Sequence, residues 1–193
     1  MNLPTGLGET FSLVGESGCG KSTTGKLIDH LITPDSGEIW FEGKEISRLS
    51  EKEMRPLRSD IQMVFQDPYS SLDPRKTAGK LIEEPLIVHK LITDKTEREK
   101  RVLELMREVG LDIQHVHRFP HEFSGGQRQR INVARALAMN PKVIVCDEPV
   151  SALDVSIQAQ VLNLFNRLQQ QYNLTYIFIS HDLGVIKHVS DRI

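Results

Sequence analysis

The sequence predicts an α/β fold, in which a mostly parallel sheet is flanked by helices and interrupted by a helical insertion. The apolar segments TFSLVG, KVIVCDEP and TYIFISHD are rich in β-branched residues and nearly continuous. This pattern is typical of strands buried on both faces of a parallel sheet. Helical patterns separate the segments, and in such folds the groups that act on a ligand gather at the carboxyl ends of the strands.

A chain of 193 residues suits a single domain with an inserted lobe. We expect residues 1–66 and 141–193 to form the α/β lobe, because all three apolar segments lie there. Residues 67–140 contain helical patterns but no convincing buried strand, so we expect them to form a helical lobe. The segment SGEIWFEGKEI predicts a small antiparallel β element that turns at Glu42 and Gly43.

Three helices are predicted from apolar residues that recur at helical spacing. The first follows a glycine-rich loop and is expected over residues 21–31. The second is expected to end at Gly110, because glycine is a natural helix stop. The third follows the segment KVIVCDEP. Their inward faces are expected to comprise Leu27, Ile28 and Leu31 in the first helix, Val102, Leu105, Met106 and Val109 in the second, and Ile157, Val161, Leu164, Phe165 and Leu168 in the third.

Composition and charge exclude several classes of function. The 24 Lys and Arg residues nearly balance the 26 Asp and Glu residues, so we expect no nucleic-acid partner. No apolar run approaches the roughly eighteen residues that a membrane span needs, and the first ten residues do not resemble a signal peptide. Cys19 and Cys146 lie in a glycine loop and an apolar strand, so we expect no disulfide and a cytoplasmic location.

A glycine loop after the first predicted strand has the pattern G-x-x-x-x-G-K followed by serine or threonine. The glycines allow the backbone to curl its N–H groups inward, and the helix start adds partial positive charge, so the loop is suited to phosphate. We expect Lys21 to reach the outer phosphates of a nucleotide and the Ser22 hydroxyl to bind Mg²⁺. The residues assigned to this cradle are Gly15, Glu16, Ser17, Gly18, Cys19, Gly20, Lys21, Ser22 and Thr23.

Polar side chains follow the other predicted strands. Asp147 is expected to complete the Mg²⁺ site, since this ion prefers oxygen ligands. Glu148 is the candidate general base that polarises a water for attack on the γ-phosphate. His181 ends the third strand and is expected at the same edge, and Gln66 offers an amide to metal and water. We assign catalytic roles to Glu148, His181, Lys21 and Gln66, and metal-binding roles to Ser22, Gln66 and Asp147.

A second glycine loop, FSGGQ, lies about a hundred residues after the first. Ser124 and Gln127 form a capping-box pattern at the start of a helix, so one interpretation is simply a well-capped helix. However, two consecutive glycines, Gly125 and Gly126, weaken a helix and are expected only where the backbone approaches something closely. A helix start with a free hydroxyl suits a phosphate, which a partner chain could supply.

These motifs, taken together from Gly8 to Ile193, resemble the ATP-binding-cassette (ABC) ATPases, which have a P-loop NTPase core. Gly15–Ser22 resembles their Walker A loop, VIVCDE their Walker B segment and His181 their switch histidine. Gln66 resembles the Q-loop glutamine, FSGGQ the signature motif with Phe123 in place of leucine, and Ser151–Asp154 the D-loop. The segments FQDPYSSLDPRKT and DEPVSALDVSIQAQV are similar to the ATPase subunits of bacterial dipeptide and oligopeptide importers, some of whose relatives carry nickel.

The resemblance implies partners. In this family two cassettes meet head to tail, and each ATP is held between the Walker A loop of one and the signature loop of the other. Ser124, Gly125, Gly126 and Gln127 are therefore expected to bind the partner's ATP, and Ser124, Gly126 and Asp154 to lie at the dimer interface. Transmembrane permease subunits are expected to contact the segment that follows Gln66, up to about His89, with an external solute-binding protein as an indirect partner. The chain is then peripheral on the inner face of the membrane.

Two alternatives stay open. The chain departs from the family pattern at both ends, since no adenine-stacking aromatic residue precedes the Walker A loop and further carboxyl-terminal strands are missing. A truncated or catalytically impaired cassette would act mainly as an ATP-binding dimerisation partner. A cassette ATPase outside transport is the other alternative, although neither a long coiled-coil insertion nor a second cassette is present.

Overall fold

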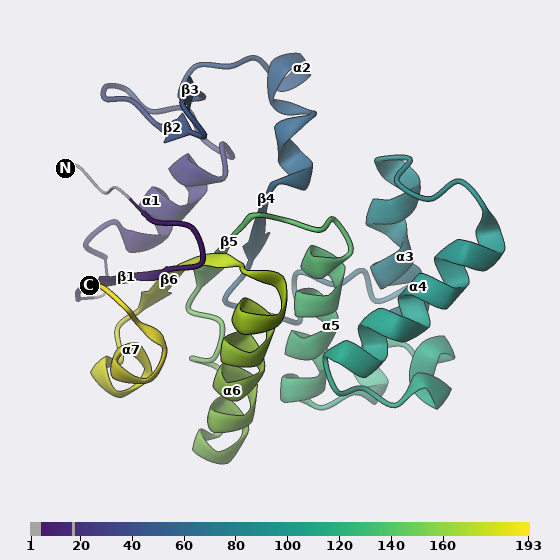
Figure 1. Ribbon diagram of the computed structural model, residues 1–193. Coiled ribbons are helices and arrows are strands. Elements are labelled where there is room, and N and C mark those ends of the chain that lie inside the picture. Colours follow the sequence, from purple (N-terminus) through teal and green to yellow (C-terminus); the bar gives the residue numbers. More distant parts are fainter. Residues whose placement is uncertain (1–4, 17) are drawn as a thin grey trace.

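The computed structural model describes residues 5–16 and 18–193, and its centre is a four-stranded parallel sheet (Figure 1). The strands are β1 (Thr10–Val14), β4 (Ile61–Val64), β5 (Val143–Asp147) and β6 (Thr175–Ser180), in the order β1-β6-β5-β4. Because all four are parallel, their carboxyl ends lie at one edge. The three strands expected from the apolar segments are confirmed.

Helices cover both faces of the sheet. Helix α1 (Lys21–Ile28) lies on one face, while α5 (Gly125–Leu137), α6 (Val155–Tyr172) and α7 (Leu183–Val189) lie on the other (Figure 1). The strand side chains alternate accordingly: Val145 and Ile177 belong to the core beneath α1, whereas Cys146 and Phe178 belong to the larger core on the opposite face. This confirms that the strands are buried on both faces.

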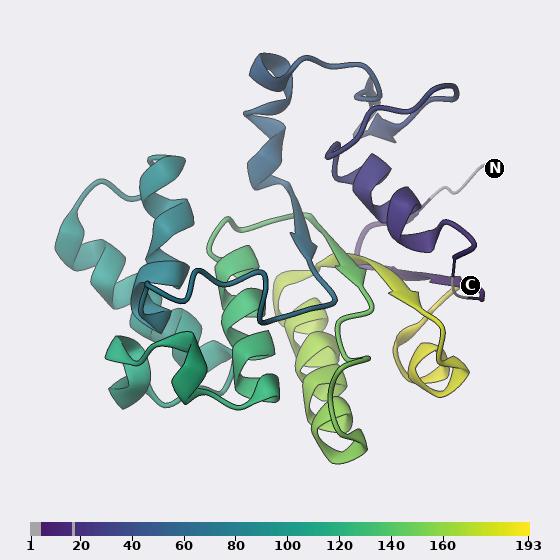
Figure 2. The same ribbon diagram turned by 180° about the vertical axis from the view of Figure 1, so that it is seen from behind.

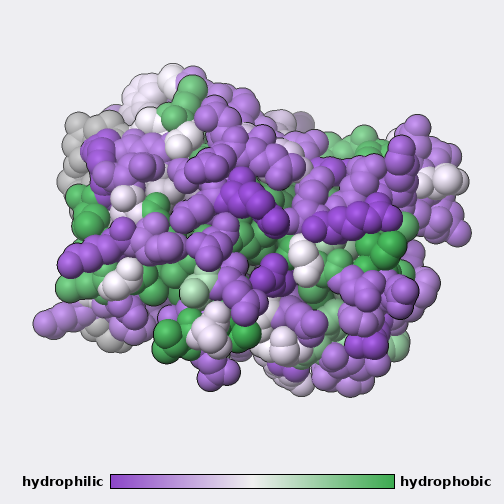
Figure 3. All heavy atoms as spheres, turned by 60° about the horizontal axis from the view of Figure 1, so that its bottom comes forward, coloured by the Kyte–Doolittle hydropathy of each residue, from purple (hydrophilic) through white to green (hydrophobic). Residues whose placement is uncertain are grey.

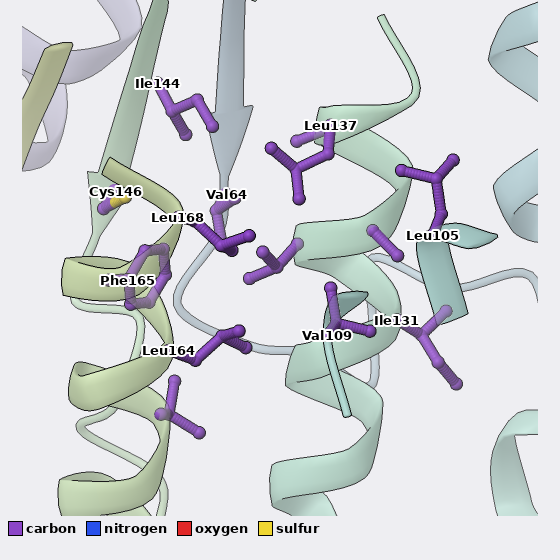
Figure 4. Packing of buried hydrophobic residues seen from close by; sticks show 14 of the residues in the cluster. Val64, Leu105, Val109, Ile131, Leu137, Ile144, Cys146, Leu164, Phe165 and Leu168 are labelled. Atoms are coloured by element: carbon purple, nitrogen blue, oxygen red, sulfur yellow. The ribbon is translucent and has the colours of Figure 1, made fainter. Parts of the chain in front are cut away.

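The larger core extends without a break from the sheet into the helices of the middle region. Helices α3 (Ala78–Val88) and α4 (Lys95–Glu108) pack with α5, and the short 3-10 helices Ile113–His117 and Pro120–Glu122 connect α4 to α5. Figure 4 shows Leu105 and Ile131 on the side of these helices and Val64, Phe165 and Leu168 on the side of the sheet, all in one cluster. The division into two lobes at residues 67 and 141 therefore stays a prediction.

Local signals define the helix ends in this region. Asp94 accepts a hydrogen bond from the Glu97 N–H at 2.9 Å and starts α4, and Gly110 adopts a φ of 73° just beyond its end. The face of Val102, Leu105, Met106 and Val109 is buried as predicted. In α6, Val161, Leu164, Phe165 and Leu168 are buried and Ile157 is partly buried.

The predicted antiparallel element is present as β2 (Trp40–Phe41) and β3 (Lys44–Glu45). Glu42 and Gly43 both have positive φ, 49° and 77°, which matches the twist that a two-residue hairpin turn requires. This element, with α2 (Glu51–Met54) and the 3-10 helix η1 (Leu57–Ser59), packs on a small core of its own around Ile46, Met54 and Ile61.

One local prediction was wrong, and one strand was not predicted. The first helix ends at Ile28 and not at residue 31, because His30 turns into the left-handed region with a φ of 54°. Leu31 is consequently directed outward and is 45% exposed. The segment Ile61–Val64 was not expected to be a strand, yet it forms the edge strand β4 beside β5. In the part of the chain that the structure describes, no helix is long and apolar enough to cross a membrane.

Candidate nucleotide-binding site

The phosphate loop connects β1 to α1 and lies at the carboxyl edge of the sheet. Gly18 and Gly20 adopt φ values of 82° and 97°, a left-handed conformation that glycine tolerates without strain. A β-carbon on Gly15 would lie 2.8 Å from the Cys19 sulfur, so this position has no room for a side chain. Ser17 lies outside the described residues. The residue before α1 is Gly20, which has no side chain to cap the helix, so the first N–H groups of α1 remain oriented toward the loop.

Lys21 lies inside the loop and is 9% exposed. Its Nζ donates hydrogen bonds to the backbone oxygens of Gly15 and Glu16, both at 2.8 Å. No carboxylate among the described residues forms an ion pair with it, so its charge is not neutralised within the chain. A buried ammonium group surrounded by backbone dipoles is well suited to bind an anionic phosphate.

Ser22 and Asp147, which are 125 residues apart, are in direct contact. The Ser22 hydroxyl donates to Asp147 Oδ1 at 2.8 Å, across the gap between the start of α1 and the end of β5. Asp147 is 5% exposed, and burial raises the pKa of its carboxyl group, with a smaller contribution from Glu148; the Ser22 hydrogen bond and the charges of Lys26 and Lys21 oppose this. The structure thus brings two predicted oxygen ligands together.

This oxygen pair fits Mg²⁺, which usually binds one or two carboxylates and completes its shell with substrate phosphates and water. Among the described residues, no group of three or more His, Cys, Asp and Glu side chains could hold a metal ion by itself.

Glu148 is held between two other predicted catalytic residues. Its Oε2 accepts a hydrogen bond from Gln66 Nε2 at 3.0 Å, and its Oε1 lies 3.1 Å from His181 Nδ1. The Glu148 side chain is 14% exposed, whereas that of His181 is 55% exposed. Glu148 has a φ of 46°, and its N–H donates to the Ile179 oxygen of β6 at 2.9 Å. A glutamate in this backbone conformation is strained, which is common at functional sites.

Ser151, the first residue of the segment that resembles the D-loop, also belongs to this cluster, which the sequence did not indicate. Its hydroxyl lies 3.4 Å from Gln66 Nε2 and donates to the Glu148 backbone oxygen at 3.0 Å. It therefore links the turn after β5 to the loop after β4. A serine three residues after an acidic strand end is a common turn residue, so no sequence signal predicts its contact with Gln66.

The second glycine loop starts α5, as predicted. Ser124 and Gln127 form the capping box, with Ser124 N donating to Gln127 Oε1 at 3.0 Å and Gln127 N to Ser124 Oγ at 3.3 Å. Within the described residues, no hydrogen bond joins this loop to the phosphate loop. Ser124 is exposed, and so is Asp154, which precedes α6.

The glycines of this loop pack against the neighbouring segment of the same chain. A β-carbon on Gly126 would overlap with the Ile157 side chain of α6, and one on Gly125 would lie 3.2 Å from Leu153 Cδ2. The close approach that the two glycines were expected to allow is thus present within the chain at Gly126. Figure 3 views the molecule from the side where α5 and α6 begin, and shows hydrophilic residues with hydrophobic ones exposed between them.

Comparisons with known proteins agree with this geometry. The profile described as "ABC transporter" matches residues 1–151. An oligopeptide transport ATP-binding protein of Bacillus subtilis is 58% identical over 96% of this chain and 56% of its own length. A dipeptide transport ATP-binding protein of Lactococcus lactis is 57% identical over 96% of this chain and 60% of its own length. The chain therefore spans somewhat more than half the length of these relatives.

The fold matches a solved ATP-binding cassette, whose dimeric structure is a post-hydrolysis state bound to ADP and Pi. The TM-score is 0.88, the sequence identity is 34%, and the match covers all of this chain and 83% of that one. The family match and the similarity to this ADP-bound cassette support ATP binding by this chain. The chain belongs to the ABC transporter family.

Proposed function

We propose that this chain binds ATP with Mg²⁺ and hydrolyses it, and that two such cassettes drive a membrane importer of peptides. The observation that carries the proposal is the position of Glu148, which lies between Gln66 and His181 and directly follows Asp147, the partner of Ser22. A base, an amide, an imidazole and a metal-binding pair therefore converge at the edge that the phosphate loop occupies.

The residues divide the chemistry of phosphoryl transfer among them. Lys21 and the N–H groups at the start of α1 bind the β- and γ-phosphates. Ser22 and Asp147, with Gln66 at the rim, would hold Mg²⁺, which would supply positive charge that offsets the charge of the phosphates. Glu148 accepts a hydrogen bond from the attacking water, and its two neighbours, Gln66 and His181, keep its carboxylate oriented.

The second glycine loop acts on the nucleotide of a partner cassette. Two features support this assignment: Ser124 and Asp154 are exposed, and no hydrogen bond within the described residues joins the loop to its own phosphate loop. The dimeric state of the solved cassette is a further support. Ser124, Gly125, Gly126 and Gln127 would bind the partner's ATP, while Asp154 lies at the interface.

The names of the relatives support the choice of solute, since they are oligopeptide and dipeptide transport proteins. Transmembrane permease subunits and, indirectly, an external solute-binding protein are then the partners, and the cassette is peripheral on the inner face of the membrane. Segment 67–89 would contact the permease. It follows the Gln66 end of β4 and includes α3, so a movement there reaches Glu148 through a single hydrogen bond.

Glu148→Gln tests the catalytic assignment. We expect this variant to bind ATP as the unchanged chain does, because the amide is isosteric, and to lose at least about a hundredfold in the rate of hydrolysis, the usual contribution of a general base. Glu99→Gln, at an exposed position on α4, is the matched control. Unchanged hydrolysis by Glu148→Gln would show that the base is elsewhere.

Ser124→Asp tests the trans arrangement. Aspartate is as good a helix N-cap as serine, so α5 should remain intact, but its charge would repel the partner's γ-phosphate. We expect Glu148→Gln to dimerise with ATP in light scattering, and Glu148→Gln with Ser124→Asp to stay monomeric. Ser124→Asn, a neutral cap, is the control. Dimerisation of the aspartate variant at the same ATP concentration would argue against the proposed interface.

A further inference from the structure

A groove runs beside β4 on the outer side of the sheet, between the end of α1 and the helices α3 and α5. It encloses a cavity of about 440 Å³. Figure 2 shows β4 with α1 on one side and α3 and α5 on the other, and α2 above it. Several large hydrophobic side chains in its lining are exposed: Leu31 (45%), Phe65 (39%) and Val88 (56%). Apolar side chains that gather in one cavity and remain exposed mark a site for a partner.

One carboxylate in the lining of this groove has no partner. Asp29 follows the last residue of α1 and is only 7% exposed. Within the described residues its side chain accepts no hydrogen bond and forms no ion pair. The charge of Arg58 acts on Asp29, but its guanidinium donates to the backbone oxygens of Asp29 and His30, at 3.1 and 3.3 Å, and to the Glu51 carboxylate at 3.1 Å.

None of the other titratable or charged side chains that line or adjoin the groove donates a hydrogen bond to Asp29 in the part of the chain that the structure describes. Glu84 of α3 accepts a hydrogen bond from Lys76 at 2.7 Å, and Arg135 of α5 donates to the Ser71 backbone oxygen at 3.1 Å. Burial lowers the pKa of His89, with further contributions from Arg55 and Arg58, which disfavours its protonated form. His30 is buried and its Nε2 has no partner. Asp29 is thus the carboxylate in the lining that lacks a donor.

The state of Asp29 is costly for the isolated chain. Burial raises the pKa of its carboxyl group to about 7, and the charge of Arg58 opposes this only in part. A buried carboxylate that lacks hydrogen-bond donors is disfavoured in its ionised form, and a donor from outside removes this penalty. A cationic group that enters the groove and donates a hydrogen bond to Asp29 would therefore stabilise the ionised carboxylate.

We infer that Asp29 selects the segment that docks in this groove by accepting a Lys or Arg side chain from it. The occupant is an amphipathic segment of the membrane partner, with one basic residue on the same side as the apolar residues that pack on Leu31, Phe65 and Val88. The inference rests on the proposed function, because a membrane subunit is the partner that this function requires. It adds a charge requirement that the apolar lining does not impose.

This recognition has a pH signature. A docked cation favours ionised Asp29, so binding releases a proton, and the affinity increases as the pH rises through the pKa of about 7. At pH 6 about a tenth of the carboxyl groups are ionised, and at pH 8 about nine tenths, so we expect about a tenfold gain in affinity between these pH values. A purely apolar interaction would have no such dependence.

The experiment uses labelled helical peptides of roughly 14 residues, near the mean helix length. Each has a leucine face that carries, at one central position, Lys, Glu or norleucine. Fluorescence anisotropy measures their binding to the 193-residue chain and to its Asp29→Asn variant at pH 6 and pH 8. We expect the Lys peptide to bind the unchanged chain at least tenfold more tightly than the Glu peptide at pH 8. Asp29→Asn should remove both this preference and the pH dependence.

Glu84→Gln is the matched control, because Glu84 lines the same groove but is already paired with Lys76. It should keep the preference for lysine. Equal binding of the three peptides, stronger binding of the Glu peptide, no binding of any peptide, or an unchanged preference in Asp29→Asn would each overturn the inference. ATP hydrolysis by the same preparations separates the two proposals: intact hydrolysis without a lysine preference contradicts only the docking inference, and a lysine preference without hydrolysis contradicts only the proposed function.

Discussion

Gly126 in the second glycine loop and Ile157 in α6 are packed so closely that a methyl group on residue 126 would overlap with the Ile157 side chain. Ile157 lies three residues after Asp154, which precedes α6. The start of α5 and the start of α6 are therefore locked together. If both contact a partner cassette, they move toward it as one unit.

We predict that Gly126→Ala destabilises the fold through this contact. Helix propensity alone would make alanine about 1 kcal/mol more favourable than glycine in α5. Overpacking typically costs about 1–3 kcal/mol, so a net loss of stability identifies the contact as the cause. The free energy of unfolding in urea measures the effect.

Ile157→Ala supplies the partner for a double-mutant cycle. Ile157→Ala removes the atoms that the new methyl group would meet. The free energy of unfolding of the double variant should therefore exceed the value expected from adding the two single effects by at least about 1 kcal/mol. Gly125→Ala, whose methyl group would meet Leu153 at 3.2 Å, should cost less. Simple additivity would show that the contact does not limit residue 126. If the double variant is stable but hydrolyses ATP slowly, Gly126 has a second role, in contact with the nucleotide.

Asp29→Asn should stabilise the chain in a pH-dependent manner. The folded pKa of about 7 lies above the ordinary value of 3.8, so the folded state binds the proton more tightly than the unfolded state does. The penalty is therefore absent below pH 4, develops between pH 4 and pH 7, and is complete above pH 7. At about 1.4 kcal/mol per unit of pKa, the variant should gain up to roughly 4 kcal/mol at pH 8 and nothing at pH 4. Urea titrations at the two pH values measure this, and an equal effect at both would contradict it.

Ser22→Ala should raise the Mg²⁺ concentration that supports half-maximal ATP hydrolysis by roughly tenfold, because one of the two converging oxygen ligands is lost. Thr24→Val is the control, since the Thr24 hydroxyl donates to the Gly20 oxygen at 3.1 Å and not to Asp147. Burial raises the pKa of Asp147, so protonation should compete with Mg²⁺ at a higher pH than for an ordinary aspartate. A Mg²⁺ titration that is identical in Ser22→Ala and the unchanged chain would remove Ser22 from the metal site.

Lys21→Met should weaken ATP binding by roughly tenfold to a hundredfold, because a charge-assisted hydrogen bond contributes about 1.5–3 kcal/mol. The loop should also lose the two hydrogen bonds that Lys21 donates to Gly15 and Glu16. Lys100→Met, at an exposed position on α4, is the control. Calorimetry measures the affinity. An unchanged affinity in Lys21→Met would contradict the assignment of the phosphate loop.

Local sequence determined much of this protein. Gly18 and Gly20 set the curl of the phosphate loop, Ser124 and Gln127 cap α5, and Glu42 with Gly43 forms the hairpin turn. These features depend on residues within a few positions of one another, so backbone preferences and hydrophobic spacing are sufficient to predict them. The apolar faces of α4 and α6 follow from the same periodicity.

The order of the strands decided the rest. Ser22 meets Asp147 across 125 residues because α1 packs over β5, and Gln66 meets Glu148 across 82 because β4 pairs with β5. No local pattern encodes that order, and it is packing against both faces that selects it. The same holds for β4, a four-residue edge strand. It also holds for Asp29, because α1 ends before His30, whose left-handed backbone directs Leu31 outward beside Asp29 in the groove. Local sequence motifs were sufficient to identify the reacting groups, whereas long-range packing determined that they lie together and formed the groove beside β4.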